Sequence, residues 1–145
     1  MLGLNEIKEY IPQREPFLMI DEVEELIPGE RVVAIKHVKE DEYYFKGHFP
    51  GQPVMPGVLI VESMAQAGAV GVLSMPANKG KNAFFGGIDG ARFRGMVVPG
   101  DTLRITVTLE NVKSRGGKGH GEVVRLEKDG TESRVASADI LFMFG

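Results

Sequence analysis

The sequence predicts an α+β fold in which a largely antiparallel β-sheet packs against one central helix. Residues 57–75 form one long apolar run that follows a proline, and about six shorter segments are rich in β-branched residues or alternate apolar and polar residues, as half-buried strands do. Most of these segments are joined by turns too short for the crossovers that parallel strands need. Because no linker or repeat divides the chain, residues 1–145 are expected to form a single domain.

The N-terminal third predicts a short helix, a hairpin and a further short strand. Asn5 is a suitable cap for a helix over Glu6–Tyr10. Pro28-Gly29-Glu30 predicts a hairpin turn before Arg31–Lys39, which alternates like a half-buried strand. The aromatic segment Asp41–Phe45 is interpreted as one more strand.

The C-terminal half predicts four strands. A glycine-interrupted strand is expected over Ala83–Phe93, and Thr102–Val112 alternates strictly between apolar and polar residues. Gly119–Lys128 and Glu132–Phe144 flank Asp129-Gly130, a strong hairpin signal. These segments supply most of the predicted sheet.

The central helix, expected over Val58–Met75 with Pro56 near its start, has apolar residues on every side and should be buried all round, in part by a partner subunit. Val58, Glu62 and Gln66 nevertheless share one face at spacings of four residues. An unpaired carboxylate in such a place is costly, and burial raises its pKa. The helix alone leaves two readings of Glu62: a structural group satisfied by backbone N–H groups or an arginine, or a functional acid.

His48 favours the functional reading, because it lies in a turn-rich segment just before the helix. The other two histidines, His37 and His120, are interpreted as surface residues, and the three show no metal-ligand spacing. Ser63 lacks the context of a serine nucleophile. A histidine, a carboxylate in apolar surroundings and free N–H groups at a helix N-terminus are together the parts of a proton-transfer site with an oxyanion binder.

The geometry of a helix predicts that two chains share this site. At about 100° and 1.5 Å per residue, Gly57 and Glu62 differ by about 140° of rotation and roughly 7.5 Å of rise. Their polar groups in one chain therefore do not point at one small substrate centre. A site that takes His48 and Gly57 from one chain and Glu62 from another removes the conflict.

Composition and charge argue against several classes of protein. The net charge of −3 disfavours a nucleic-acid-binding protein, and the absence of cysteine excludes disulfides, a thiol nucleophile and a cysteine-based metal site. The run 57–75 is about long enough to span a bilayer, but Glu62, Ser63 and Gln66 within it argue against a membrane segment. The N-terminus lacks the pattern of a signal peptide, so a cytoplasmic protein is expected.

Basic residues are concentrated in one part of the chain. Residues 76–104 hold five basic side chains against two acidic ones. This is either a chance fluctuation on a solvated surface or a patch for an anionic partner. The candidates for such a patch are Lys79, Lys81, Arg92 and Arg94.

The sequence resembles the β-hydroxyacyl-acyl-carrier-protein dehydratases of type II fatty acid synthesis, in their general, glutamate-containing branch. The resemblance covers almost the whole chain and is carried by four motifs: 16-PFLMID-21, 47-GHFPGQPVMPGVLIVESMAQAG-68, 87-GIDGARFRG-95 and 98-VPGD-101. One departure is 13-QREPF-17, where family members often read His-Arg-Tyr-Pro-Phe. No chemistry is expected in that region.

The resemblance implies a hot-dog fold, no cofactor, no metal and removal of water from a (3R)-hydroxyacyl thioester to give a trans-2-enoyl thioester. By position, His48 and Glu62 match the catalytic pair, and Gly57 matches the N–H that holds the thioester carbonyl. The residues expected to bind substrate around that pair are Gly57, Val58, Gln66 and Phe84. The implied partners are an acidic acyl carrier protein at the basic patch and further copies of the chain, as a trimer of dimers.

Three other functions stay open at this point. A thioesterase on the same fold would use the carboxylate to activate water, and a bifunctional dehydratase/isomerase would carry the same residues. A non-catalytic acyl-binding module would use Glu62 only to close a hydrogen-bond network.

Overall fold

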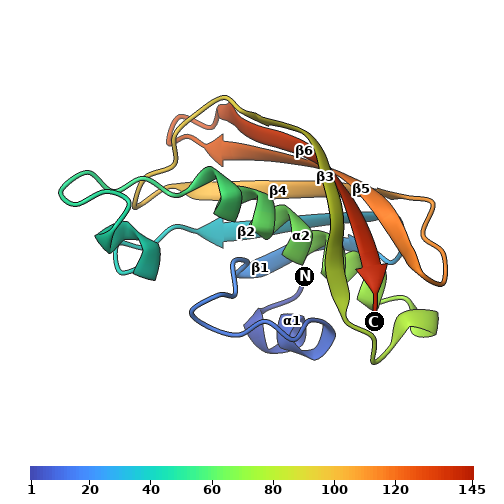
Figure 1. Cartoon of the computed structure of the whole chain (residues 1–145). Helices are drawn as coiled ribbons and strands as arrows, with labels where there is room; N and C mark the ends of the chain where they lie inside the picture. Colours follow the sequence, from blue (N-terminus) through green and yellow to red (C-terminus); the bar gives the residue numbers. More distant parts are fainter.

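The computed structural model describes all residues 1–145 and shows one antiparallel sheet curved around one long helix (Figure 1). The sheet has six strands in the order β1-β2-β4-β5-β6-β3. The elements are α1 (Leu4–Tyr10), β1 (Glu22–Ile27), β2 (Arg31–His37), the 3₁₀ helix η1 (Tyr43–Lys46), α2 (Gly57–Leu73), the 3₁₀ helix η2 (Pro76–Asn78), β3 (Ala83–Phe93), β4 (Thr102–Glu110), β5 (Gly116–Leu126) and β6 (Glu132–Phe144). The predicted α+β class and its hot-dog arrangement are confirmed.

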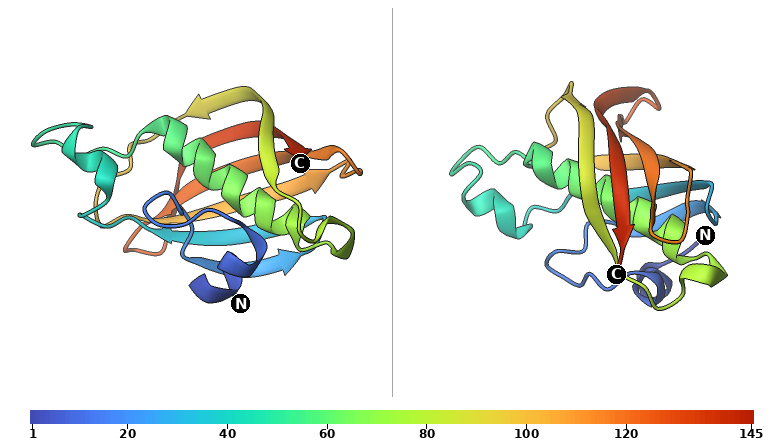
Figure 2. Two further views of the ribbon diagram at one scale, coloured as in Figure 1. Left: turned by 60° about the horizontal axis from the view of Figure 1, so that its bottom comes forward. Right: turned by 45° about the vertical axis from the view of Figure 1, so that its right-hand side comes forward.

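Helix α2 runs along the inner face of the curved sheet (Figure 2). Two glycines allow this close approach. A Cβ atom on Gly71 would lie 2.6 Å from Val32 Cγ2 and 2.7 Å from Leu109 Cδ1, and one on Gly68 would overlap the ring of Phe142. Glycine therefore sets the distance between helix and sheet at both strands β2 and β6.

The predicted alternation of buried and exposed residues along β4 is confirmed. Leu103, Ile105, Val107 and Leu109 are buried against the helix, whereas the residues between them are partly or fully exposed. The hairpin turns at Pro28-Gly29 and Asp129-Gly130 are also confirmed, since β1 pairs with β2 and β5 with β6 in antiparallel register.

Strand β2 is more buried than its alternation suggests. Val33 and Ile35 point away from the helix but are each only 7% exposed. Ile35 lies opposite Arg104, whose guanidinium forms ion pairs with Glu24 and Glu132 across this outer face. The prediction of a half-buried strand is therefore wrong, because neighbouring long side chains cover the outer face.

Two local predictions near the N-terminus are also wrong. The first helix begins at Leu4 with Gly3 as its cap, so Asn5 lies inside the helix. The segment predicted as a strand over Asp41–Phe45 is the 3₁₀ helix η1. Its backbone bonds are local, from Phe45 N–H to the carbonyl of Glu42 and from His48 N–H to that of Tyr44, and Tyr44 and Phe45 are both buried.

Candidate active site

The side chain of Gln66 is held rigidly in the core beside Glu62. Gln66 is fully buried and accepts a 2.6 Å hydrogen bond from the backbone N–H of Met19. Its Nε2 donates to the carbonyl of Phe17 and to Glu62 Oε2, both at 2.9 Å. With both ends of its amide engaged, Gln66 fixes one oxygen of the Glu62 carboxyl group.

The Glu62 carboxyl group has no cationic partner. Its hydrogen bond from Gln66 is its only one, and it forms no ion pair. Burial raises its pKa, and the Gln66 amide opposes this rise. The structural reading of Glu62, as a carboxylate satisfied by an arginine or by backbone N–H groups, is therefore not what the structure shows.

Glu62 opens into a small cavity of about 220 Å³ between α2, β3 and the loop after α1. Seven of the nine residues around it are hydrophobic, and the two polar ones are Glu62 and Gln13. The lining residues are Gln13, Phe17, Glu62, Ala65, Ala69, Ala83, Phe84, Phe85 and Phe142. The predicted substrate-binding residue Phe84 thus lies at the same cavity as Glu62.

The 13–17 region, in which the sequence predicts no chemistry, lies directly beside Glu62. Gln13 and Phe17 both line the Glu62 cavity, and the carbonyl of Phe17 accepts a hydrogen bond from Gln66. The loop folds back onto α2 because Gln66 binds its backbone at two points, Phe17 and Met19. The only sequence signal for Gln13 is that it stands where related sequences often have histidine.

His48 lies in the loop between η1 and α2, which projects beyond the N-terminal end of the helix (Figure 1). Its Nδ1 is 2.7 Å from the carbonyl oxygen of Val54, and its ring stacks on Phe49 with centroids 4.1 Å apart. A carbonyl oxygen only accepts, so Nδ1 carries the hydrogen. In the neutral ring Nε2 is then left with a free lone pair, the form that a general base needs.

The start of α2 presents two unpaired backbone donors. The N–H groups of Gly57 and Val58 make no hydrogen bond within the chain, as expected at a helix N-terminus. The ring of Phe93 packs so closely over Gly57 that a Cβ there would lie 2.9 Å from Phe93 Cε1. Val58, one of the predicted substrate-binding residues, is 75% exposed and does not line the Glu62 cavity. Only its backbone N–H, at the start of the helix, is available to bind a substrate.

One chain does not bring the predicted catalytic residues together. Neither His48 nor Gly57 lines the cavity that contains Glu62, Phe84 and Gln13. The predicted site residues thus lie in two places: His48 and Gly57 at the N-terminal end of α2, and Glu62 and Phe84 on its flank.

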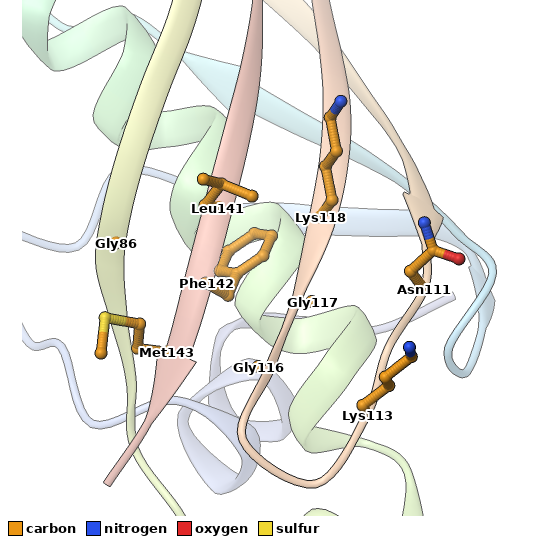
Figure 3. Close-up of a pocket in the computed structure, with 9 residues that line it drawn as sticks. All are labelled: Gly86, Asn111, Lys113, Gly116, Gly117, Lys118, Leu141, Phe142 and Met143. Carbon is orange, nitrogen blue, oxygen red and sulfur yellow. The ribbon is translucent and has the colours of Figure 1, made fainter.

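A larger cavity of about 580 Å³ elsewhere on the sheet lacks the chemistry of a proton-transfer site (Figure 3). It is formed by strands β3, β5 and β6 together with the segment before β5. Its polar side chains are those of Asn111, Lys113 and Lys118, with no histidine or carboxylate.

The predicted basic patch is divided between the two ends of α2. Arg92 and Arg94 flank Phe93, which contacts the helix start, whereas Lys79 lies near Leu73 at the helix end, with Lys81 two residues beyond it. These ends are about 25 Å apart for a helix of 17 residues. None of the four cations forms an ion pair.

Two further observations concern membranes and metals. No helix is both long and apolar enough to cross a membrane. No group of three or more histidine, aspartate or glutamate side chains is arranged to hold a metal ion.

Comparison with known proteins shows the family. Residues 11–137 match the model of the FabA-like domain. The chain is 55% identical over 144 residues to the 3-hydroxyacyl-[acyl-carrier-protein] dehydratase FabZ of Enterococcus faecalis, with 99% of each chain covered. It is 53% identical over 145 residues to the protein of the same name from Ligilactobacillus salivarius, with both chains covered completely.

Solved structures share the fold at lower sequence identity. The dehydratase heterocomplex ApeI:P from Xenorhabdus doucetiae superposes with a TM-score of 0.80 at 16% identity, covering 100% of this chain and 92% of that one. A thioesterase superfamily member from Thermus thermophilus gives a TM-score of 0.63 at 17% identity, covering 84% and 85%. Together with the family match and the full-length relatives, these findings confirm the resemblance: the chain belongs to the FabA-like family, among its FabZ dehydratases.

Proposed function

We propose that the protein is a (3R)-hydroxyacyl-[acyl-carrier-protein] dehydratase, which removes water from a 3-hydroxyacyl thioester to give a trans-2-enoyl thioester in fatty acid biosynthesis. The observation that carries the proposal is the Glu62 carboxyl group, which has a raised pKa and no cationic partner in an apolar cavity. The full-length similarity to the FabZ dehydratases supports the same reaction.

The reaction needs a base at C2, an acid at C3 and stabilisation of the thioester oxygen. His48 Nε2 takes the C2 proton while the N–H of Gly57 stabilises the negative charge that develops on the carbonyl oxygen. The C3–O bond then breaks as Glu62 gives its proton to the departing hydroxyl, which leaves as water. General acid–base assistance contributes about 10²–10⁴-fold per group, and one oxyanion donor about 10²–10³-fold.

The geometry supports a site shared between two chains. Strand β3 is an edge strand that is largely exposed on both faces, and its exposed apolar residues are Phe84, Phe85, Ile88 and Phe93. An unpaired edge of this kind favours pairing with another strand. A second copy bound at β3 brings the His48 half-site of one chain to the Glu62 half-site of the other. The family resemblance extends this to a trimer of such dimers.

An acidic acyl carrier protein is the proposed substrate carrier. Of the four basic candidates, Arg92 and Arg94 support this best, because they lie beside the Gly57 end of the helix, where the thioester is held. Their guanidinium groups donate hydrogen bonds only to Ala91 O and Ser137 Oγ and form no ion pair, so both are free to pair with a partner's carboxylates.

A single assay separates this proposal from its alternatives. We expect the protein, mixed with a 3-hydroxyacyl thioester, to produce enoyl absorbance without release of free thiol. Thiol release identifies a thioesterase, conversion of the product to a non-conjugated enoyl chain identifies an isomerase, and binding without turnover identifies an acyl-binding module. Each of these results contradicts the proposal of a simple dehydratase.

A further inference from the structure

A lysine is buried on the otherwise apolar inner face of strand β2. Val32, Ala34 and Lys36 share the face of β2 that packs toward α2, and Lys36 lies opposite the buried Leu103 of β4. Lys36 is only 2% exposed. Its Nζ forms one ion pair, at 2.8 Å to Oε2 of Glu42, the residue that precedes η1. The pair is therefore largely removed from water and joins β2 to the start of η1.

A buried ion pair of this kind is better explained by position than by stability. Removing two charges from water offsets most of their attraction, so apolar side chains in the same place stabilise a fold about as well. An unpaired lysine there would be costly, however. The chain therefore favours the one arrangement that brings Glu42 to the amine of Lys36, and this arrangement fixes where η1 lies.

The short helix η1 connects Glu42 directly to the proposed base. The N–H of Phe45 donates to the carbonyl of Glu42 at 3.2 Å, and the N–H of His48 donates to that of Tyr44 at 3.1 Å. Tyr44 is buried, and its ring packs edge-to-face against the rings of Tyr43 and Phe45. A displacement of Glu42 would thus be passed on to the backbone of His48.

The opposite end of this segment is held separately. The N–H of Val54 donates to the carbonyl of His48 at 2.9 Å, and the N–H of Met55 donates to that of Val97 at 2.8 Å. Between Glu42 and Met55 the chain projects beyond the start of α2 (Figure 1). The position of His48 therefore depends on contacts at both ends of the segment, and the Lys36–Glu42 pair is the contact at the first end.

We propose that Lys36 and Glu42 are positioning residues for the catalytic His48, because their ion pair fixes η1 and so sets where Nε2 of His48 meets the substrate. This inference rests on the proposed dehydratase function and deepens it. Neither residue touches the reacting atoms. Loss of the pair acts through geometry alone, and a displacement of about 1 Å can cost about 100-fold in rate.

The test compares single and double variants that remove the charges and keep the length of the side chains. Lys36→Met and Glu42→Met each leave one charge unpaired, so both should be less stable than the parent protein. The double variant Lys36→Met/Glu42→Met leaves no charge and should recover most of the lost stability. Its kcat should nevertheless stay about 100-fold below that of the parent, while KM changes little.

A matched control separates positioning from general loss of stability. Val107 is fully buried in β4 and contacts neither η1 nor the segment that bears His48. Val107→Ala should lower the free energy of unfolding but leave kcat of the folded protein unchanged. Denaturant unfolding and steady-state kinetics are measured for all five proteins.

A spectroscopic measurement reports on His48 without any turnover. The nitrogen chemical shifts of a neutral imidazole show which ring nitrogen carries the hydrogen, and His48→Ala assigns the signals of this ring. In the parent protein the hydrogen should lie on Nδ1, which donates to the carbonyl of Val54. In the double variant the signals should shift toward a mixture of both forms, whereas Val107→Ala should keep the parent spectrum.

Several outcomes would overturn the inference. A double variant with the parent's kcat shows that the pair does not position the base, and so does a lower kcat with an unchanged His48 spectrum. A double variant that does not fold assigns the pair to the fold as a whole. If the parent protein does not dehydrate the substrate, the proposed function fails, and the His48 spectra alone decide whether Lys36 and Glu42 hold the ring in place.

Discussion

The Nε2 atom of Gln66 donates a 2.9 Å hydrogen bond to Oε2 of Glu62, one helical turn earlier in α2. The same nitrogen binds the carbonyl of Phe17, and the opposite end of the amide accepts from the N–H of Met19. Gln66 therefore joins the proposed acid to the loop that closes its cavity. The orientation of Glu62 depends on the packing of a segment more than forty residues away in the sequence.

Replacing Gln66 with leucine should lower the free energy of unfolding and raise the pKa of Glu62. The N–H of Met19 and the carbonyl of Phe17 lose their partner, so the free energy of unfolding should fall by about 1–3 kcal/mol for each group left unpaired. The pKa of Glu62 should rise further, because the Gln66 amide now lowers it. The measurements are denaturant unfolding and the pH profile of kcat/KM. A basic limb that moves to lower pH in Gln66→Leu would contradict this account.

The half-buried carboxyl of Glu62 should make the protein less stable as pH rises. Its pKa in the folded chain lies above the unfolded value, so the folded state binds more protons between the two values. This contribution is fully present below the unfolded pKa and is lost as pH rises through the folded pKa. The variant Glu62→Gln, with no proton to lose there, should show a flatter stability profile over that range. Identical profiles for the two proteins would show that Glu62 ionises without cost.

Because Phe93 packs closely on Gly57, a side chain at position 57 should displace the N–H group that is proposed to bind the thioester oxygen. Gly57→Ala keeps the N–H, but the new Cβ lies 2.9 Å from Phe93 Cε1, so the ring or the helix start must move. We expect kcat to fall, by up to the 10²–10³-fold that a lost oxyanion donor costs. Adding Phe93→Ala should restore part of the rate, since it removes the overlapping ring. No recovery in the double variant would argue that the helix start is fixed by other contacts.

Charge reversal near the N-terminal end of α2 should weaken binding of the carrier protein more than charge reversal near its C-terminal end. Arg92→Glu and Arg94→Glu should raise KM for a carrier-linked substrate more than for a short thioester analogue, and the difference should shrink at high salt. Lys79→Glu and Lys81→Glu are the matched controls at the far end of the helix, where Lys81 contacts Asn78 Oδ1 and the carbonyl of Ser114. A larger rise in KM for the carrier-linked substrate in the two lysine variants would place the carrier-binding surface at the C-terminal end of α2 instead.

Breaking the exposed edge of β3 should separate the two half-sites. Ile88 is 47% exposed at the middle of this strand, so Ile88→Glu places a charge on the proposed interface at little cost to a single chain. Sedimentation should show smaller species, and dehydratase activity should fall with dimer content. A fully active monomer would contradict the shared site.

The sequence predicts those features that depend on local periodicity and chain order. The alternation in β4, the hairpin at Asp129-Gly130 and the polar line of Glu62 and Gln66 in an apolar helix all follow from spacing. The 3₁₀ helix η1 is missed because its aromatic residues resemble a strand, and the choice depends on where Tyr44 and Phe45 find a core.

Long-range contacts within the site are not readable from the sequence. Gln13 reaches the Glu62 cavity because Gln66 binds the loop after α1, and nothing in the residues 13–17 themselves indicates that contact. The four cations lie near one another in the sequence, but Lys79 lies near Leu73 at the C-terminal end of α2, whereas Arg92 and Arg94 flank Phe93 at its start, so they separate in space.

Mixing two inactive variants tests the central claim, a dehydratase site shared between chains, most directly. His48→Ala and Glu62→Gln should each lose about 10²–10⁴-fold in rate while remaining folded. Unfolded, mixed and refolded together, they should regain enoyl formation, because a mixed dimer contains one site with an intact His48 from one chain and an intact Glu62 from the other. A mixture that stays as inactive as its components would place both residues of each site in one chain and contradict the account.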